Sequence, residues 1–172
     1  NQGVFAVFGQ PVANFLDLPH NGRFLALERV QDPGNVGALI RSAAAFGFDG
    51  VILSPGCADP FGPKVLRASM GAAGRMPVVT CPNLADALAQ LRAWGSTCLA
   101  AALYNSRPLH EVDGAYPDGV CVVIGSEGQG LSDGVIAACD AAVRIPIASK
   151  VESLNASVAG SVLLWHFRGE IQ

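Results

Sequence analysis

Short continuous runs of Val, Ile and Leu alternate along the chain with segments of helical periodicity, and this alternation constrains the fold most strongly. Residues 51–54 and 120–125 are apolar at nearly every position, as in strands buried on both faces. Such strands, each followed by a helix, predict an α/β fold, a mostly parallel sheet with helices on both faces. The expected strands are 23–30, 51–54, 76–80, 97–103, 120–125 and 141–146, and the expected helices are 36–46, 64–71, 84–94, 131–139 and a terminal helix that Ser153 or Asn155 caps.

The composition indicates one domain that shares some of its surface with a partner. The chain has 172 residues, of which 51% are hydrophobic and only 15% are charged. This balance disfavours disorder, and it predicts apolar surface that a second copy covers. The formal net charge of -3 gives no whole-chain signal for nucleic acid, so any polyanion site must be local. No run of 18 apolar residues predicts a membrane span.

Five cysteines are present, with no C-x-x-C spacing, and three scattered histidines show no metal-ligand spacing. We therefore expect buried, reduced thiols, no metal site and a location in the cytoplasm.

Polar side chains concentrate in three loops, each between an expected strand and an expected helix. In the first, Asn35 is a natural helix cap, and Arg41 is the only charge of an otherwise apolar or small helix. The second, residues 125–130, reads Gly-Ser-Glu-Gly-Gln-Gly, which lets the backbone approach a ligand closely. The third, before the terminal helix, contains Lys150, Ser153 and Asn155.

The glycine-rich loop matches none of the common ligand motifs. Its spacing is G-x-x-G-x-G rather than the G-x-G-x-x-G of dinucleotide sites, and the Gly-Lys-Ser/Thr of a P-loop is missing. The carboxylate of Glu127 would repel phosphate but would accept a ribose hydroxyl or an arginine; a plain tight turn is the other interpretation. Since ligands of parallel sheets bind at the carboxyl ends of the strands, we expect the three loops to converge there. The combined set can orient a hydroxyl and hold a phosphate, whereas group-transfer chemistry would need a cofactor.

In this order the motifs N-x-G-x-x-x-R, G-x-E-x-x-G and I-P…S-L-N-x-S-x-A resemble the SpoU-type, or TrmH-like, RNA ribose 2′-O-methyltransferases of the SPOUT superfamily. The resemblance covers residues 23–168. Residues 1–22, with a short expected strand at 4–8, look like a lead-in from an N-terminal RNA-binding domain, and 23–172 then form the catalytic domain. The residues that carry the resemblance are Asn35, Gly37, Arg41, Gly125, Glu127, Gly130, Ile145, Pro146, Ser153, Leu154, Asn155, Ser157 and Ala159.

The resemblance implies a C-terminal deep trefoil knot, S-adenosyl-methionine as cofactor and a homodimer with composite active sites. It implies methyl transfer to a ribose 2′-hydroxyl, in which Arg41 activates the hydroxyl, Ser153 and Asn155 position phosphate and ribose, and Asn35 and Glu127 orient Arg41 or shape the loops. Arginine is a poor base, so electrostatic stabilisation of the developing alkoxide is the simpler role. The cofactor contacts implied are Leu103, Gly125, Gly130, Ile145 and Leu154.

Ribosomal RNA is the expected substrate, with transfer RNA as the alternative. Lys64 and Arg67 form a modest basic segment that either follows RNA or lies in solvent, and Lys150 has the same two interpretations. Two other classes stay open: a non-catalytic RNA-binding module and a nucleotide-binding oxidoreductase. The failed dinucleotide spacing disfavours the oxidoreductase, and the joint presence of Arg41, Glu127 and Asn155 disfavours the module.

Overall fold

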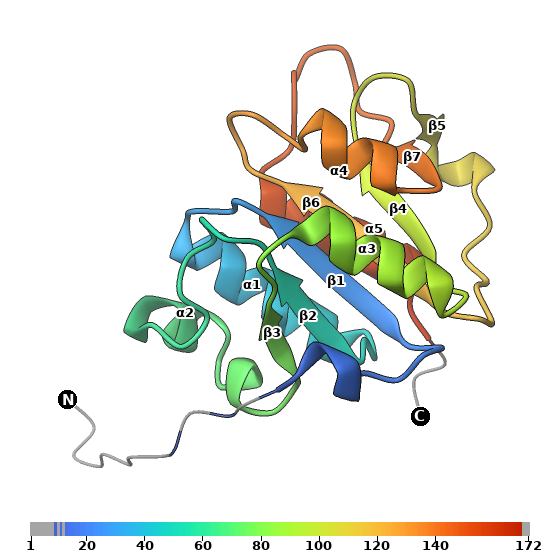
Figure 1. The fold of residues 1–172 in the computed structure, drawn as a ribbon. Helices are drawn as coiled ribbons and strands as arrows, with labels where there is room; N and C mark the ends of the chain where they lie inside the picture. Colours follow the sequence, from blue (N-terminus) through green and yellow to red (C-terminus); the bar gives the residue numbers. More distant parts are fainter. Residues whose placement is uncertain (1–8, 10, 12, 170–172) are drawn as a thin grey trace.

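The computed structural model describes residues 9, 11 and 13–169, and the expected strand at 4–8 lies outside them. Strands and helices alternate as the sequence predicts (Figure 1). The strands are β1 (Arg23–Glu28), β2 (Gly50–Leu53), β3 (Val78–Thr80), β4 (Thr97–Ala101), β5 (Arg107–Pro108), β6 (Val120–Gly125) and β7 (Ala141–Arg144). The helices are α1 (Pro33–Ala45), α2 (Pro63–Ala68), α3 (Leu84–Ala93), α4 (Asp133–Ala138) and α5 (Ala156–His166), with single turns at η1 (Phe15–Asp17), η2 (Ala72–Gly74) and η3 (Leu109–Glu111).

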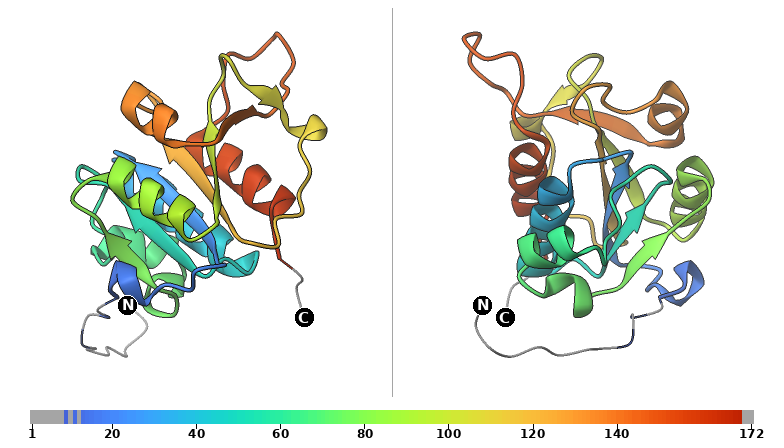
Figure 2. Two further views of the ribbon diagram at one scale, coloured as in Figure 1. Left: turned by 45° about the vertical axis from the view of Figure 1, so that its right-hand side comes forward. Right: turned by 90° about the vertical axis from the view of Figure 1, so that its left-hand side faces the viewer.

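The strands form one seven-stranded sheet in the order β3-β2-β1-β6-β4-β7-β5, and every recorded pairing is parallel. Helices α1, α2 and α5 cover one face, and α3 and α4 cover the other (Figure 2). The expected α/β fold with helices on both faces is therefore confirmed.

Side chains that alternate along each strand fill two separate cores. In β1, Leu25 and Leu27 pack under α1 and α5, whereas Phe24 and Ala26 pack under α3 and α4. All four are fully buried. Burial on both faces explains why the strands are apolar without alternation.

Several expected boundaries are wrong by a few residues. Helix α1 starts at Pro33 rather than at residue 36, because Asp32 is its cap and accepts from the Asn35 amide at 2.8 Å. Asn35 is therefore not the cap, and its side chain is free for another partner. Helix α2 ends at Ala68, before the left-handed Met70, and strands β1, β4 and β7 each end two residues earlier than expected. The edge strand β5, only two residues long and half proline, has too short a pattern to be predicted.

Helices α1 and α5 lie side by side on the sheet. The hydroxyl oxygens of Ser42 and Ser161 are 2.8 Å apart. A Cβ at Gly160 would lie 2.3 Å from a methyl carbon of Leu39, so the two helices approach as closely as they do only because this residue is glycine. Among the described residues, no helix has the length and hydropathy needed to span a membrane.

Candidate functional site

The first two polar loops are neighbours at the carboxyl edge of the sheet. Strand β1 leads to the loop before α1, and β6 leads to the loop at residues 126–131. These strands are paired up to their last residues, with Glu28 opposite Gly125. The expected convergence of the two loops is therefore confirmed.

The glycine-rich loop is a tight hairpin held by its own backbone. The amide of Gly130 donates to the carbonyl of Ser126 at 2.8 Å. A Cβ on Gly125 would lie 2.2 Å from the carbonyl carbon of Gly130, and Gly130 has a φ of 65°. Only glycine fits both conditions without a shift of the backbone. Residues 127–130 are exposed, so most of this hairpin faces solvent.

Asn35 and Glu127 join the first loop to the second. The side-chain amide of Asn35 donates to the Glu127 carboxylate across 92 residues of sequence. The bond exists because Asp32 has taken over the capping role, which leaves the Asn35 side chain to reach the hairpin. The helix that carries Arg41 is thereby tied to the glycine-rich loop.

The third segment leads from β7 into α5, and Asn155 ends it as the cap of that helix. Its Oδ1 accepts from the amides of Ser157 at 2.9 Å and Val158 at 3.3 Å, so Asn155 rather than Ser153 is the cap. Ser153 and Asn155 are both exposed. Helix α5 itself packs on α1 through Ser42 and Ser161, whereas the loop that leads from β7 into α5 extends away from the sheet (Figure 2).

Arg41 lies on the exposed surface of α1. Within the described part of the chain, it forms no hydrogen bond or ion pair with any side chain. In particular, Asn35 and Glu127 bond to each other, and neither of them holds the guanidinium. One copy of the chain thus joins the first two loops and leaves the arginine free to meet a further group.

The residues expected at the cofactor lie after three adjacent strands, because the sheet order places β4 between β6 and β7. Gly125 ends β6, Ile145 follows β7 and is partly buried against the core, and Leu103 follows β4 and is exposed. Ser106, in the loop after β4, has a buried hydroxyl without a hydrogen-bond partner. An unpaired buried hydroxyl beside exposed apolar side chains fits a site for a partly apolar, hydrogen-bonding ligand.

The expected basic residues are all exposed, but they do not form one cluster. Lys64 and Arg67 are on α2, which packs on α1. Lys150 is in the segment after β7, on the other side of the central strands β1 and β6.

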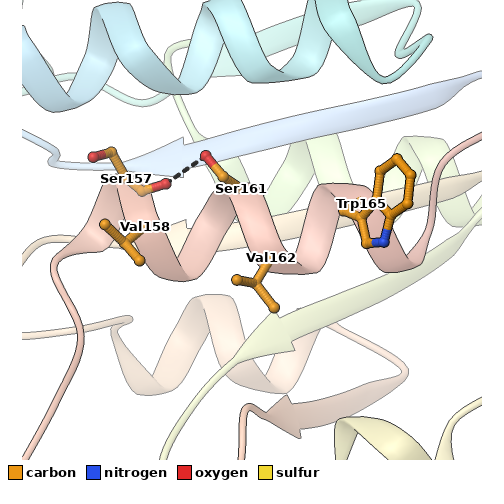
Figure 3. Close-up of a pocket in the computed structure, with 5 residues that line it drawn as sticks. All are labelled: Ser157, Val158, Ser161, Val162 and Trp165. Atoms are coloured by element: carbon orange, nitrogen blue, oxygen red, sulfur yellow. Dashed lines mark hydrogen bonds between the residues drawn. The ribbon is translucent and has the colours of Figure 1, made fainter.

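A hollow of about 390 Å³ lies along the outer face of α5 and is mainly apolar. Figure 3 shows that its lining side chains all come from this one helix, so it is a shallow surface feature that begins next to the third loop at Ser157. Its lining residues are Ser157, Val158, Ser161, Val162 and Trp165.

Four of the five cysteines are poor candidates for a nucleophile. All five are free thiols, and burial raises the pKa of Cys57, Cys81 and Cys121, and raises that of Cys139 to about 12. The thiols whose pKa is raised stay protonated at neutral pH, and a protonated thiol is a poor nucleophile.

Sequence reasoning missed one polar group near the loops, the carboxylate of Glu28. The sequence pattern predicts only that this residue belongs to a strand. The signal was the charge itself, since Glu28 is an acidic residue near the end of an otherwise apolar run.

A parallel α/β sheet with polar and glycine-rich loops at the carboxyl ends of its strands is typical of nucleotide- and cofactor-binding proteins. The chain matches the model of the SpoU rRNA Methylase family over residues 22–165 and belongs to that family.

Relatives with longer chains agree with this assignment. The chain is 41% identical over 150 residues to an uncharacterized tRNA/rRNA methyltransferase of Synechocystis, covering 87% of this chain and 54% of the relative. It is 36% identical over 147 residues to the 23S rRNA (guanosine(2553)-2′-O)-methyltransferase RlmP of Bacillus subtilis, covering 86% of this chain and 58% of that protein. The chain thus spans little more than half the length of these two curated relatives.

Solved structures agree as well. The AdoMet-bound rRNA methyltransferase from Sinorhizobium meliloti is 32% identical and superposes with a TM-score of 0.84, covering 92% of this chain and 60% of that one.

Proposed function

We propose that residues 23–172 are the catalytic domain of an S-adenosyl-methionine-dependent methyltransferase that modifies a ribose 2′-hydroxyl of RNA, with residues 1–22 leading into it. The Asn35–Glu127 hydrogen bond carries this proposal, because it ties the helix of the candidate arginine to the glycine-rich loop. Membership of the SpoU family and the named activity of the Bacillus subtilis relative support it.

S-adenosyl-methionine is held by the loops after β4, β6 and β7, through the backbone near Leu103, Gly125, Gly130, Ile145 and Leu154. The free hydroxyl of Ser106 and the exposed side chains of Leu103 and Leu154 suit a ligand with polar and apolar parts. The cofactor supplies an activated methyl group. The protein therefore has to align the acceptor oxygen and accommodate its lost proton.

Arg41 acts on the acceptor side. An exposed, unpaired guanidinium can stabilise the charge that develops on the ribose oxygen, directly or through a phosphate held against it. Ser153 and Asn155 position phosphate and ribose, and the hydrogen bonds that the side chain of Asn155 accepts as the cap of α5 hold this side chain in place for the task. Asn35 and Glu127 shape the loops rather than orient Arg41, because they bond to each other.

RNA is the substrate class, and ribosomal RNA is the preferred one. The named substrate of the Bacillus subtilis relative supports ribosomal RNA, whereas the name of the Synechocystis relative keeps transfer RNA as the alternative. Lys64 and Arg67 on α2 and Lys150 beyond β7 contact the phosphate backbone from two sides of the site.

The working unit is a homodimer that packs through α5. Val158, Val162 and Trp165 on this helix are 50%, 39% and 51% exposed and form an apolar face that a second copy would bury. Arg41 is on the neighbouring helix, so a partner at this face would bring an arginine to a composite site. The order β6-β4-β7, with β4 between two later strands, supports the knotted C-terminal path. The free thiols support a cytoplasmic location.

The melting temperature of the purified chain with each cofactor tests the proposal. S-adenosyl-methionine should raise the melting temperature, and NAD should leave it unchanged. Labelled methyl should then pass to ribosomal RNA in preference to transfer RNA. Stabilisation by NAD would favour an oxidoreductase, and RNA binding without methyl transfer would favour a non-catalytic module.

A further inference from the structure

Glu28 is a buried carboxylate at the end of an apolar strand. It is the last residue of β1 and only 7% exposed, and it pairs in register with Gly125, where the glycine-rich loop begins. A buried carboxylate is costly unless hydrogen bonds or an opposite charge satisfy it. Its partners therefore indicate what the residue does.

Ser132 provides two of those partners. Its backbone amide donates to one carboxylate oxygen of Glu28 and its hydroxyl donates to the other, both at 2.8 Å. The same hydroxyl accepts from the amide of Val135 at 3.4 Å and so caps α4. The guanidinium of Arg29 lies 3.4 Å from the carboxylate and balances its charge.

This pair holds the exit of the glycine-rich loop. The loop leaves β6 at Gly125, is tied at Glu127 to Asn35, and ends at Ser132. Helix α4, which follows, has only six residues and cannot stabilise itself. Glu28 therefore adds a buried anchor at the exit of a mostly exposed loop, beside the Gly130–Ser126 hydrogen bond within the hairpin and the packing of Leu131.

We infer that Glu28 is a positioning residue for the cofactor: through Ser132 it fixes the exit of the 126–131 loop, so that the backbone of this loop is held ready for S-adenosyl-methionine. This inference rests on the proposed function. It predicts that Glu28 acts on the cofactor side of the reaction and leaves the RNA side unchanged.

The test compares the KM for S-adenosyl-methionine with the KM for RNA in Glu28→Ala, Glu28→Gln and Ser132→Ala. Loss of a buried charged hydrogen-bond pair should raise the cofactor KM about tenfold in the two alanine variants, with the RNA KM within about twofold of wild type. Glu28→Gln should recover most of the cofactor affinity. The amide oxygen of glutamine can accept from the Ser132 backbone N–H, and its NH₂ group can donate to the Ser132 hydroxyl oxygen once that hydroxyl turns. The double variant Glu28→Ala with Ser132→Ala should be no weaker than either single variant.

Asp140→Ala is the matched control. Asp140 also accepts a backbone amide, from Cys98 at 2.8 Å, and pairs with an arginine, Arg92 at 2.7 Å. It directly precedes β7 and so lies at the amino-terminal ends of the strands, whereas the glycine-rich loop lies at their carboxyl ends. If Glu28 had a purely structural role, Glu28→Ala would behave like Asp140→Ala. Both variants would then have a lower melting temperature, and the KM for S-adenosyl-methionine and the KM for RNA would stay at the wild-type values.

The outcomes separate the two proposals. If wild type transfers methyl and Glu28→Ala keeps the cofactor KM of the Asp140→Ala control, the positioning role is wrong and the proposed function stands. If wild type neither binds S-adenosyl-methionine nor methylates RNA, both proposals fail. Should Glu28→Ala not fold, Ser132→Ala and Glu28→Gln decide the question by the same comparison.

Discussion

Asn35 donates a hydrogen bond from its side-chain amide to the carboxylate of Glu127, and this bond joins two segments 92 residues apart. Asn35 is in the first turn of α1, the helix that also carries Arg41 and packs on α5 through Ser42 and Ser161. The glycine-rich loop and the arginine helix therefore form one connected unit. A substitution that disorders the glycine-rich loop should therefore also affect the position of helix α1, and the reverse should hold.

Loss of the Asn35–Glu127 bond should weaken cofactor binding. Asn35→Ala and Glu127→Ala are each expected to lower the affinity for S-adenosyl-methionine about fivefold by calorimetry, since the net contribution of a hydrogen bond is roughly 1 kcal/mol. The double variant should bind like either single variant. Asn14→Ala, which removes an exposed Asn–Asp hydrogen bond far along the chain from these loops, is the control and should bind normally. Unchanged affinity in both single variants would contradict the link.

An alanine at Gly125 should disrupt the loop by backbone collision. The added Cβ would meet the carbonyl oxygen of Gly130 at 2.3 Å and the amide of Leu131 at 2.5 Å, and neither can move without opening the hairpin. Gly125→Ala is expected to abolish detectable cofactor binding and to lower the melting temperature. Gly128→Ala changes the same loop at a position with nothing within 4 Å, and should bind nearly as wild type does. Equal effects of the two substitutions would refute the steric argument.

A charge on the outer face of α5 should separate the dimer. Val162→Asp places a carboxylate where a second copy would bury apolar surface, so we expect a monomer by light scattering and a loss of methyl transfer. Leu16→Asp, at a side chain that is 75% exposed and far from α5 in the sequence, is the control and should remain dimeric and active. A wild-type chain that is monomeric at every concentration would exclude this interface.

The raised pKa of Cys139 predicts slow alkylation of the native protein. Burial raises this pKa from 9.0 to about 12, so at pH 8 the reactive thiolate should be about 10³-fold rarer than in the unfolded chain. The folded state keeps the proton between pH 9 and 12 while the unfolded state releases it, so this group stabilises the fold below pH 9 and the contribution is lost as pH rises through that window. Mass spectrometry of the Cys139 peptide after iodoacetamide treatment measures the rate. Equal native and denatured rates would rule out the shift.

The sequence was sufficient to predict the sheet, because doubly buried strands such as 120–125 must be apolar throughout. It was also sufficient to select the three loops, since polar and glycine residues between such strands have few structural reasons to be there. The cap of α1 was misassigned to Asn35 because Asp32 and Asn35 are both good caps, and only the backbone shows which one is used. Glu28 was overlooked because its partner, Ser132, is 104 residues away, and no local pattern predicts that contact. For the same reason, the sequence did not show that Asn35 and Glu127 would bond to each other rather than to Arg41.

Methyl transfer by wild type and Arg41→Ala, followed by nuclease digestion of the RNA and mass spectrometry of the nucleosides, tests the central claim most directly. Arg41 is exposed and bonds to no described residue, so its loss should leave the fold and the affinity for S-adenosyl-methionine intact. The account predicts a 2′-O-methylated nucleoside with wild type and a loss of at least about 10²-fold with Arg41→Ala. Full methylation by Arg41→Ala, or a methyl group on a base instead of a ribose, would contradict it.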